Sequence, residues 1–306
     1  MSTENRAHPK LLNREFALQN AQDIIALASP LLTEVVNYAT NAYVRCQTSA
    51  RDPSFGDLPP LMIYLHMIEM TDGIEQLVAG SCSGPIHPLL RTSLEGFISL
   101  EYLFKEHYEQ RCRQWLVCHI SEEINYYERF DTRTSRGHQF RQTLNDQGIK
   151  DDLQVDALEQ LIGYRGQLDE PELKGIAEVY RRSKQKTWYS LFNGPRNLRE
   201  LAASVSKLAE YDLLYTQWSK TTHGRSASRY LKELKSGTLA VLNLRDAEWL
   251  KDDAVMAASF LAGATRLMIH KFRRGERIQD WLHKLDDIMG PLRALEVRAR
   301  LVGEDS

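Results

Sequence analysis

The sequence predicts an all-α protein, a multi-helix bundle, and three observations predict it. Apolar residues recur at helical spacing along almost the whole chain. Helix start signals precede several of these periodic segments, and the linkers between them are short and rich in Gly, Pro and Ser. Only TLAVLNL, at 238–244, has the pattern of a strand, so at most one short strand or hairpin is expected there.

The predicted helices follow one another with short connections. Pro59 and Pro60 precede one helix, Pro88 lies in the first turn of the next, and Asn197 precedes a later one. We expect helices over residues 13–28, 30–47, 59–80, 86–106, 108–130, 151–166, 170–183, 197–206, 208–223, 250–273 and 277–301. This order divides the chain into N-terminal helices at 1–58, a core helical domain at 59–225 and a C-terminal helical extension at 226–306.

The composition is ordinary for a globular protein. Hydrophobic residues make up 42% of the 306 residues and charged residues 26%, which argues against disorder. The net charge of −2 excludes an overall basic surface for nucleic acid but leaves room for a local basic patch. The four cysteines form no CxxC pair, the start has no secretion-signal pattern, and no apolar run approaches the roughly 18 residues of a membrane span. We therefore expect a cytoplasmic protein with no membrane partner.

The helix expected over 59–80 is apolar over most of its circumference, so it is predicted to lie centrally. His66, Glu69 and Asp72 fall between its two apolar stripes at helical spacing. Polar side chains in such a position require partners, because burying an unpaired polar group costs free energy. The three residues are therefore predicted members of a polar network.

Arg91 and Glu95 lie four residues apart on the next predicted helix and can touch on one face. Desolvating an isolated charge costs several kcal/mol, so a buried Arg91 requires a carboxylate. Glu95, Glu69 or Asp72 could supply it. The small residues beside this pair, among them Gly96, allow another helix to approach closely.

In YDLLYTQWSKTTHG, at 211–224, four polar residues recur every fourth position, so they share one helix face: Tyr211, Tyr215, Ser219 and His223. The hydroxyl groups could join the network around the buried arginine. His223 is expected in the last helical turn before Gly224, where the helix dipole favours the imidazolium ion. A histidine held there could donate a proton or contact an anion.

Two interpretations of these polar residues remain open. In the first they form a satisfied polar core that fixes the register of the helices. In the second they form an inward-facing site, in which Arg91, Glu95, Ser219 and His223 are the catalytic residues and Tyr211 and Tyr215 belong to the supporting network.

Four segments together resemble a prokaryotic all-helical family known only as a domain of unknown function, number 5677: LHMIEMTDGI, LLRTSLEGFISLEYL, NLRELA and YDLLYTQWSKTTHG. The resemblance spans about residues 60–225 and leaves both ends of the chain uncovered. It maps onto His66, Glu69, Asp72, Arg91, Glu95, Tyr211, Tyr215, Ser219 and His223. It implies an all-helical fold and supplies no activity.

A more distant comparison is with the HEPN helical ribonucleases of toxin and phage-defence systems, which pair an Arg with a His four to six residues later. Four pairs here have that spacing: Arg113–His119, Arg133–His138, Arg266–His270 and Arg277–His283. Chance alone gives about two such pairs in a chain this rich in Arg. His223 has no Arg at that spacing before it, so Arg91 of another helix would have to take the role.

The segment YRRSKQKTWYSLFNGPRNLR, at 180–199, contains six basic residues and no Asp or Glu, with Trp188, Tyr189 and Phe192 interleaved. Basic side chains neutralise phosphates, and aromatic side chains stack on unpaired bases. The predicted nucleic-acid contacts are Arg181, Arg182, Lys184, Lys186 and Trp188. In the alternative interpretation this is a solvated loop that Trp188 anchors to the core.

No motif predicts a cofactor or a metal ion. The repeated Glu-x-x-His pairs of di-iron bundles, the glycine-rich phosphate loops and G-x-S-x-G are all missing from the sequence. We therefore predict that the protein uses no cofactor and that any ribonuclease activity is metal-independent.

Two classes of function follow. The first is an effector of the defence or toxin type that acts on RNA; the second is a non-catalytic helical scaffold or partner-binding subunit. A homo-oligomer is also expected, because Ala258, Ala262 and Gly263 form a small-residue face on a C-terminal helix, although that face is equally suited to packing within one chain.

Overall fold

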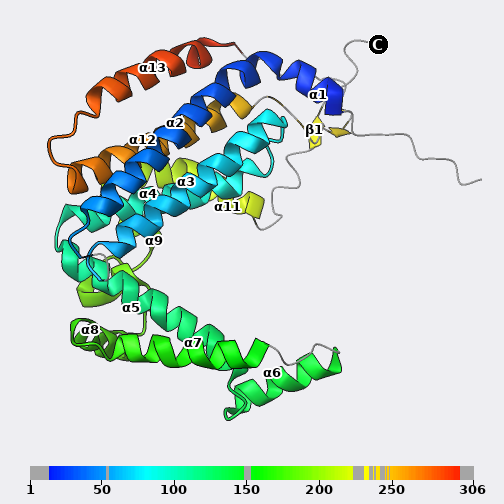
Figure 1. The fold of residues 1–306 in the computed structure, drawn as a ribbon. Helices are drawn as coiled ribbons and strands as arrows, with labels where there is room; N and C mark the ends of the chain where they lie inside the picture. The colour runs from blue at the N-terminus through cyan, green and yellow to red at the C-terminus, as the bar shows by residue number, and fades with distance from the viewer. Residues whose placement is uncertain are drawn as a thin grey trace, which may run out of the picture. The chain divides into compact units, whose positions relative to one another are not determined.

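The computed structural model describes residues 14–52, 55–147, 153–222, 231–233, 237, 239–241, 245, 247 and 249–296. These residues form an all-α fold with one two-stranded ribbon (Figure 1). The chain divides into two compact units. Unit 1 comprises Met1–Ser49, Met62–Glu101 and Lys207–Ser306, and unit 2 comprises Ala50–Leu61 and Tyr102–Ser206. The expected division of the chain at 58 and 225 stays a prediction.

Unit 1 is built mainly from long helices. It contains α1 (Arg14–Asn20), α2 (Gln22–Ser49), most of α3 (Leu58–Ala79) and of α4 (Ile86–Lys105), α10 (Leu208–Glu210), the π-helical turn η3 (Tyr211–Tyr215), α11 (Thr216–Thr222), β1 (Leu231–Glu233), β2 (Leu239–Val241), α12 (Leu250–Phe272) and α13 (Gln279–Ala294). Helix α2 packs along α12 and α13. Both α2 and α12 bury alanines, including Ala28, Ala39, Ala257 and Ala258, so their backbones can approach closely.

The helix break expected before Pro30 is wrong, because α2 continues through this proline. A proline inside a helix removes one backbone hydrogen bond and costs about 3 kcal/mol. Buried residues on both sides of it, Ala28, Leu31, Leu32 and Val35, continue one apolar face, and their packing outweighs that cost.

The strand expected within 238–244 is confirmed as β2, and its partner is β1. The two strands pair antiparallel with Leu231 opposite Val241 and Glu233 opposite Leu239.

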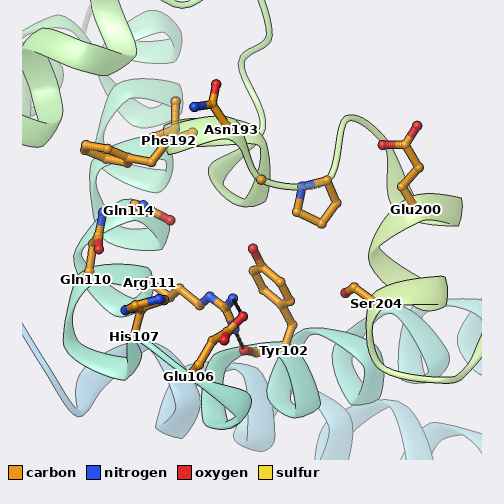
Figure 2. A pocket seen from close by; sticks show the side chains of 13 residues that line it. Tyr102, Glu106, His107, Gln110, Arg111, Gln114, Phe192, Asn193, Glu200 and Ser204 are labelled. Carbon is orange, nitrogen blue, oxygen red and sulfur yellow. Dashed lines mark hydrogen bonds and ion pairs between the residues drawn. The ribbon is translucent and has the colours of Figure 1, made fainter.

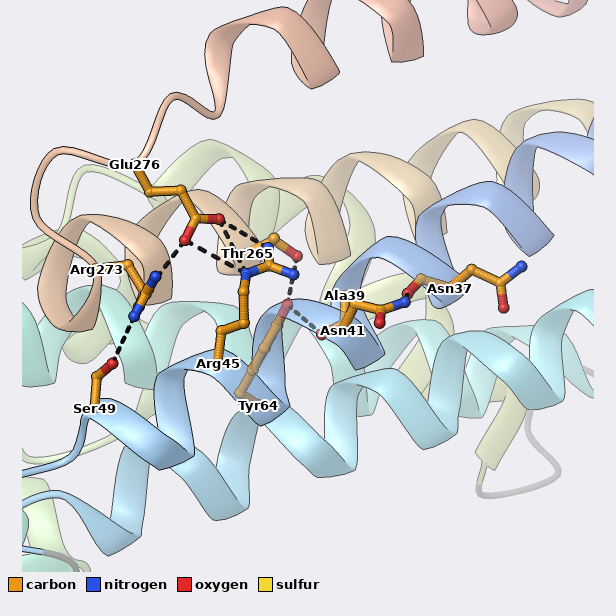
Figure 3. A network of polar contacts seen from close by, with 9 residues as sticks. All are labelled: Asn37, Ala39, Asn41, Arg45, Ser49, Tyr64, Thr265, Arg273 and Glu276. Carbon is orange, nitrogen blue, oxygen red and sulfur yellow. Dashed lines mark hydrogen bonds and ion pairs between the residues drawn. The ribbon is translucent and has the colours of Figure 1, made fainter.

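A network of polar contacts ties α2 to the segment that follows α12 (Figure 3). Glu276 accepts hydrogen bonds from Arg45 Nη2 at 2.8 Å and from Arg273 Nε at 3.0 Å. Arg273 also donates to Ser49 Oγ at 3.0 Å. The two guanidinium groups hold the pKa of Glu276 below its usual value, although burial alone would raise that pKa.

The small-residue face of α12 packs inside the chain. Ala258 and Ala262 are buried, and a side-chain carbon added to Gly263 would lie 2.9 Å from the ring of Phe97 on α4. The intramolecular alternative for this face is therefore the observed one. The expected homo-oligomer stays a prediction, and it would need another surface.

Unit 2 contains α5 (Tyr108–Tyr127), η1 (Glu128–Phe130), α6 (Ser135–Asp146), α7 (Leu153–Leu168), α8 (Pro171–Arg182), η2 (Trp188–Asn193) and α9 (Leu198–Ser204). Helix α5 packs against α7, α8 and η2. Its core joins Leu116, Val117 and Ile120 of α5 to Leu173 of α8 and Leu191 of η2. No described helix is both long and apolar enough to cross a membrane.

Candidate functional site

The three residues of α3 predicted to join a polar network lie on an exposed face. The side chains of His66 and Glu69 are 54% and 74% exposed, with His66 Nδ1 and Glu69 Oε2 3.4 Å apart, and Asp72 is exposed as well. Leu65 shares this face and is also exposed. The expectation that His66, Glu69 and Asp72 interrupt a buried surface is wrong, because these residues lie with Met62 and Leu65 on an exposed face of α3.

Arg91, Glu95 and Tyr215 do form one cluster, in unit 1. Arg91 Nε donates to Glu95 Oε1 at 3.0 Å, and Arg91 Nη2 donates to Tyr215 Oη at 2.6 Å. The guanidinium carbon also lies 4.6 Å from the centre of the Tyr215 ring, within range of a cation–π interaction. Burial raises the pKa of Tyr215 to about 12; the charge of Glu95 adds to this shift and Arg91 opposes it. The tyrosine is therefore a neutral hydroxyl at pH 7.

The residues before α11 form a π-helical turn, in which Tyr211 and Tyr215 stack with ring centres 4.6 Å apart. Such turns are rare and often lie near functional sites. Ser219 follows on α11 and is half-buried, and among the described residues no hydrogen bond joins it to Arg91 or Glu95. His223, the fourth residue of the expected row, lies outside the described residues.

The small residue Gly96, near Arg91, allows α3 to approach α4 closely. A side-chain carbon added to Gly96 would lie 2.8 Å from Met67 Cγ of α3. The close approach at Gly96 therefore involves α3 rather than the segment at 211–223.

The basic segment of unit 2 presents three free cationic side chains. Arg181, Arg182 and Lys184 are exposed, and within the part of the chain that the structure describes they form no side-chain hydrogen bond or ion pair. Lys186 differs from them. Its ammonium group donates to the carbonyl oxygen of Tyr180 at 2.6 Å and lies 4.5 Å from the centre of that ring, so it stabilises its own loop.

Trp188 lies where it can anchor the basic segment to the core, as in the interpretation of this segment as a solvated loop. It is half-buried, packs against the core of unit 2, and lies 5.6 Å from Tyr102 between ring centres. The exposed aromatic side chain of this segment is Phe192, which is 48% exposed. A base that stacks on this segment would therefore meet Phe192 rather than Trp188.

A cavity of about 560 Å³ lies entirely within unit 2, next to this segment (Figure 2). From α4, α5 and their connection it is lined by Tyr102, Glu106, His107, Gln110, Arg111 and Gln114. From η2, α9 and their connection it is lined by Leu191, Phe192, Asn193, Gly194, Pro195, Glu200 and Ser204. Its volume is in the range of pockets that hold small molecules.

Arg111 is the central charge of this pocket. Its guanidinium group is buried, lies 3.6 Å from the centre of the Tyr102 ring, and donates to the Tyr102 carbonyl oxygen and to Glu106 Oε1, the latter at 2.8 Å. A guanidinium group has five N–H donors, and these bonds use two of them. Sequence reasoning missed Arg111, although Arg111, Gln114 and Cys118 occupy the buried face of α5 at helical spacing, which was a usable signal.

Three residues that line the pocket have left-handed backbone conformations. The φ angles of His107, Phe192 and Asn193 are 49°, 54° and 63°. Each such residue costs on the order of 1–3 kcal/mol, and such strain tends to gather at functional sites. Gly194 completes the turn, because an added side-chain carbon would overlap the carbonyl oxygen of Tyr189. The pocket wall is thus held in one uncommon backbone shape.

Metal ligation receives no support from the described residues: no group of three His, Cys, Asp or Glu side chains among them could hold an ion. The polar groups of the pocket are instead amides, hydroxyls, the imidazole of His107, the Arg111–Glu106 ion pair and the carboxylate of Glu200. These groups can orient an organic ligand by hydrogen bonds.

A family model described as a family of unknown function (DUF5677) matches residues 57–238. The matched region contains Arg91, Glu95 and Tyr215, and it contains every residue that lines the pocket. No curated protein and no solved structure matches the chain. Because the match covers more than half of the 306 residues, the expected family is confirmed, and the chain belongs to the DUF5677 family.

Proposed function

We propose that the protein binds single-stranded RNA through unit 2, with one base in the pocket and the adjoining phosphates on the basic segment. The observation that carries the proposal is the order of features along the chain. Three exposed cationic residues lie shortly before the η2 turn in the chain: Arg181, Arg182 and Lys184. Phe192 of that turn is exposed and lines the pocket. Cationic side chains and an adjacent aromatic ring are the two components by which proteins hold unpaired nucleic acid.

Single strands suit this arrangement better than duplexes. An aromatic ring can stack only on a base that is free of its partner, and RNA is recognised mainly through such splayed bases. The pocket interior supplies side-chain amides from Gln110, Gln114 and Asn193, which can hydrogen-bond a base edge. The cationic groups that would neutralise phosphates lie outside the pocket lining, so the two functions are separated along the segment.

Unit 1 supports a second, non-catalytic role. Arg91, Glu95 and Tyr215 satisfy one another by hydrogen bonds, as expected of a polar seam that fixes helix register. A scaffold or partner-binding role for this unit is compatible with RNA binding by the other.

Fluorescence anisotropy with a labelled single-stranded RNA of about 12 nucleotides, within the range that one binding domain covers, tests the proposal. Replacing Arg181, Arg182 and Lys184 together by Gln should weaken binding. Three lost phosphate contacts should also reduce the slope of log K against log salt by about 2 for a single strand. A matched control replaces three exposed arginines elsewhere, Arg136, Arg274 and Arg277, by Gln.

Phe192→Ala should cost about 1–3 kcal/mol of binding free energy, the usual contribution of one stacked base. Tyr126→Ala, which removes another exposed aromatic ring of unit 2 outside the pocket lining, is its control. Equal losses in the test and control variants would mean that RNA binding is diffuse, and the proposal would then be wrong.

A further inference from the structure

We infer that the pocket selects guanine, an inference that rests on the proposed binding of RNA. Two features of the interior lead to it: its arginine and its two carboxylates are paired, and the amide of a mostly buried glutamine is open to the cavity without a hydrogen bond to another described residue. Together they specify which chemical group fits.

The charge balance excludes a phosphate as the group that enters. Glu106 Oε1 lies 2.8 Å from Arg111 Nη2, so the buried guanidinium already has its counter-ion. Glu200, the other carboxylate of the lining, is paired with Arg196 at 2.6 Å. An anion entering here would meet two carboxylates and no lysine or arginine without a counter-ion. A neutral group with both hydrogen-bond donors and acceptors avoids this repulsion.

Gln114 indicates that the pocket is made to receive such a group. Its side chain lines the cavity and only 4% of the residue is exposed, yet its amide makes no hydrogen bond to any other described residue. The amide is not one of the fully buried unpaired groups of the described residues, so it is accessible from the cavity and its donors and acceptor are available to a ligand. Figure 2 shows Gln114 on the same wall as Gln110 and Arg111. A bound base edge would satisfy the amide.

The neighbouring ion pair matches guanine among the four bases. The side chain of Glu106 is 55% exposed, and its second carboxylate oxygen is not used by Arg111. A carboxylate that accepts two adjacent N–H donors fits the N1–H and N2–H edge of guanine, while the remaining Arg111 donors suit its O6 and N7 acceptors. Adenine and uracil lack two adjacent donors, and cytosine offers only its N4 amino group to a carboxylate.

The geometry assigns different roles to the two sides of the pocket. Phe192 can stack on any base and so contributes affinity without discrimination. Glu106, on the opposite side of the pocket in Figure 2, supplies the discrimination. Binding strength and base preference should therefore respond to different substitutions.

Isothermal titration calorimetry with GMP, AMP, CMP and UMP tests the inference, because the four probes share one phosphate and differ only in the base. We expect GMP to bind about tenfold or more tightly than the others, the discrimination typical of one good bidentate contact. Titration of oligonucleotides that contain a single guanosine or none separates recognition within RNA from recognition of a free nucleotide.

Glu106→Gln should remove most of the preference for GMP, and Phe192→Ala should weaken all four ligands by similar factors. Glu109→Gln, an exposed carboxylate outside the pocket lining, is the control and should leave the preference unchanged. Gln114→Leu, which keeps the volume and removes the amide, should weaken GMP binding without loss of the folded state.

The outcomes separate this inference from the proposed function. Binding of RNA with equal affinity for all four nucleotides, or a preference for CMP, would overturn the guanine inference and leave RNA binding intact. A guanine preference that Glu106→Gln leaves unchanged would overturn it too. If neither RNA nor any nucleotide binds, the proposed function is wrong and this inference falls with it.

Discussion

Arg91 in unit 1 and Arg111 in unit 2 are two guanidinium groups that are stabilised away from water in the same way. Each lies on a largely buried helix face, each is paired with a carboxylate, and each guanidinium carbon lies close to a tyrosine ring, at 4.6 Å and 3.6 Å from its centre. Their surroundings differ. Arg111 lines a cavity, whereas the guanidinium group of Arg91 donates a hydrogen bond to the hydroxyl of Tyr215. This difference is why we assign ligand binding to the first and structure to the second.

The structural role of Arg91 predicts a coupled effect on stability. Arg91→Met alone should destabilise the protein by about 1–3 kcal/mol, because Glu95 and Tyr215 lose their partner. Adding Glu95→Gln should restore part of this loss. Urea denaturation of the single and double variants measures the coupling. The same double-mutant measurement on the solvent-accessible ion pair Glu34–Lys284 of this unit is the reference, because such pairs have small coupling energies. A coupling energy between Arg91 and Glu95 as small as that of the reference pair would contradict the structural role.

The catalytic assignment of Arg91, Glu95, Ser219 and His223 stays a prediction. It requires that the Arg91→Met, Glu95→Gln double variant lose RNA cleavage while it melts like the wild type. Cleavage of labelled RNA, followed on a denaturing gel, measures this directly. Cleavage at the wild-type rate by the double variant would leave only the structural role.

Glu276 should make stability depend on acid pH. Burial raises its pKa, but hydrogen bonds from Arg45 and Arg273 outweigh burial, so the folded-state pKa lies below the ordinary 4.5. A lowered carboxyl pKa stabilises the fold above the unfolded value, and this contribution is lost as pH falls through the folded value. Glu276→Gln should therefore lower the free energy of unfolding at pH 7 by about 1–3 kcal/mol and by less below about pH 4. Thermal melts across that range test it; a pH-independent difference would contradict the assignment.

At the scale of the elements, the shape of the η2 turn depends on the glycine that follows it. Gly194→Ala should deform the pocket wall, because the added carbon would overlap the Tyr189 carbonyl oxygen and lie 3.2 Å from Tyr102 Oη. We expect a loss of about 1–3 kcal/mol in stability together with weaker RNA binding. Gly175→Ala, at an open position on α8, is the control and should stabilise the helix by up to about 1 kcal/mol. Equal melting temperatures for the two variants would contradict the account.

Helical periodicity was enough to predict most elements, because amphipathic faces are encoded within a few turns. It failed where the deciding contact is distant in sequence. Packing on other helices keeps α2 helical through Pro30. The sequence pattern at 238–244 predicted a strand there but did not identify β1 as its partner. The π-helical turn at 211–215 also escaped prediction, since an α-helical spacing of polar residues describes it equally well.

The candidate site was predictable only in part. Arg91 and Glu95 stand four apart on one helix, so their pairing follows from local geometry. The pocket requires α4, α5, η2 and α9 to meet, which no local pattern in the sequence specifies. The left-handed conformation of Phe192 was equally hidden, although the following Asn-Gly pair marks a turn.

For the whole molecule, the expected homo-oligomer, in its simplest form a twofold dimer, remains to be tested. The small-residue face around Ala258 is buried within the chain, so it offers no free surface for a second copy. Light scattering over a range of concentrations distinguishes the cases. A dimer mass would support the expectation through another surface, whereas a concentration-independent monomer mass would remove it.

The central claim is that unit 2 binds RNA at its pocket, and photocrosslinking tests it most directly. A single-stranded RNA carrying 6-thioguanosine would be irradiated with the full-length protein, digested, and the modified peptides identified by mass spectrometry. The account predicts adducts concentrated on peptides that carry Tyr102 and Phe192, and reduced in Glu106→Gln. Adducts confined to unit 1, or spread equally over both units, would contradict it.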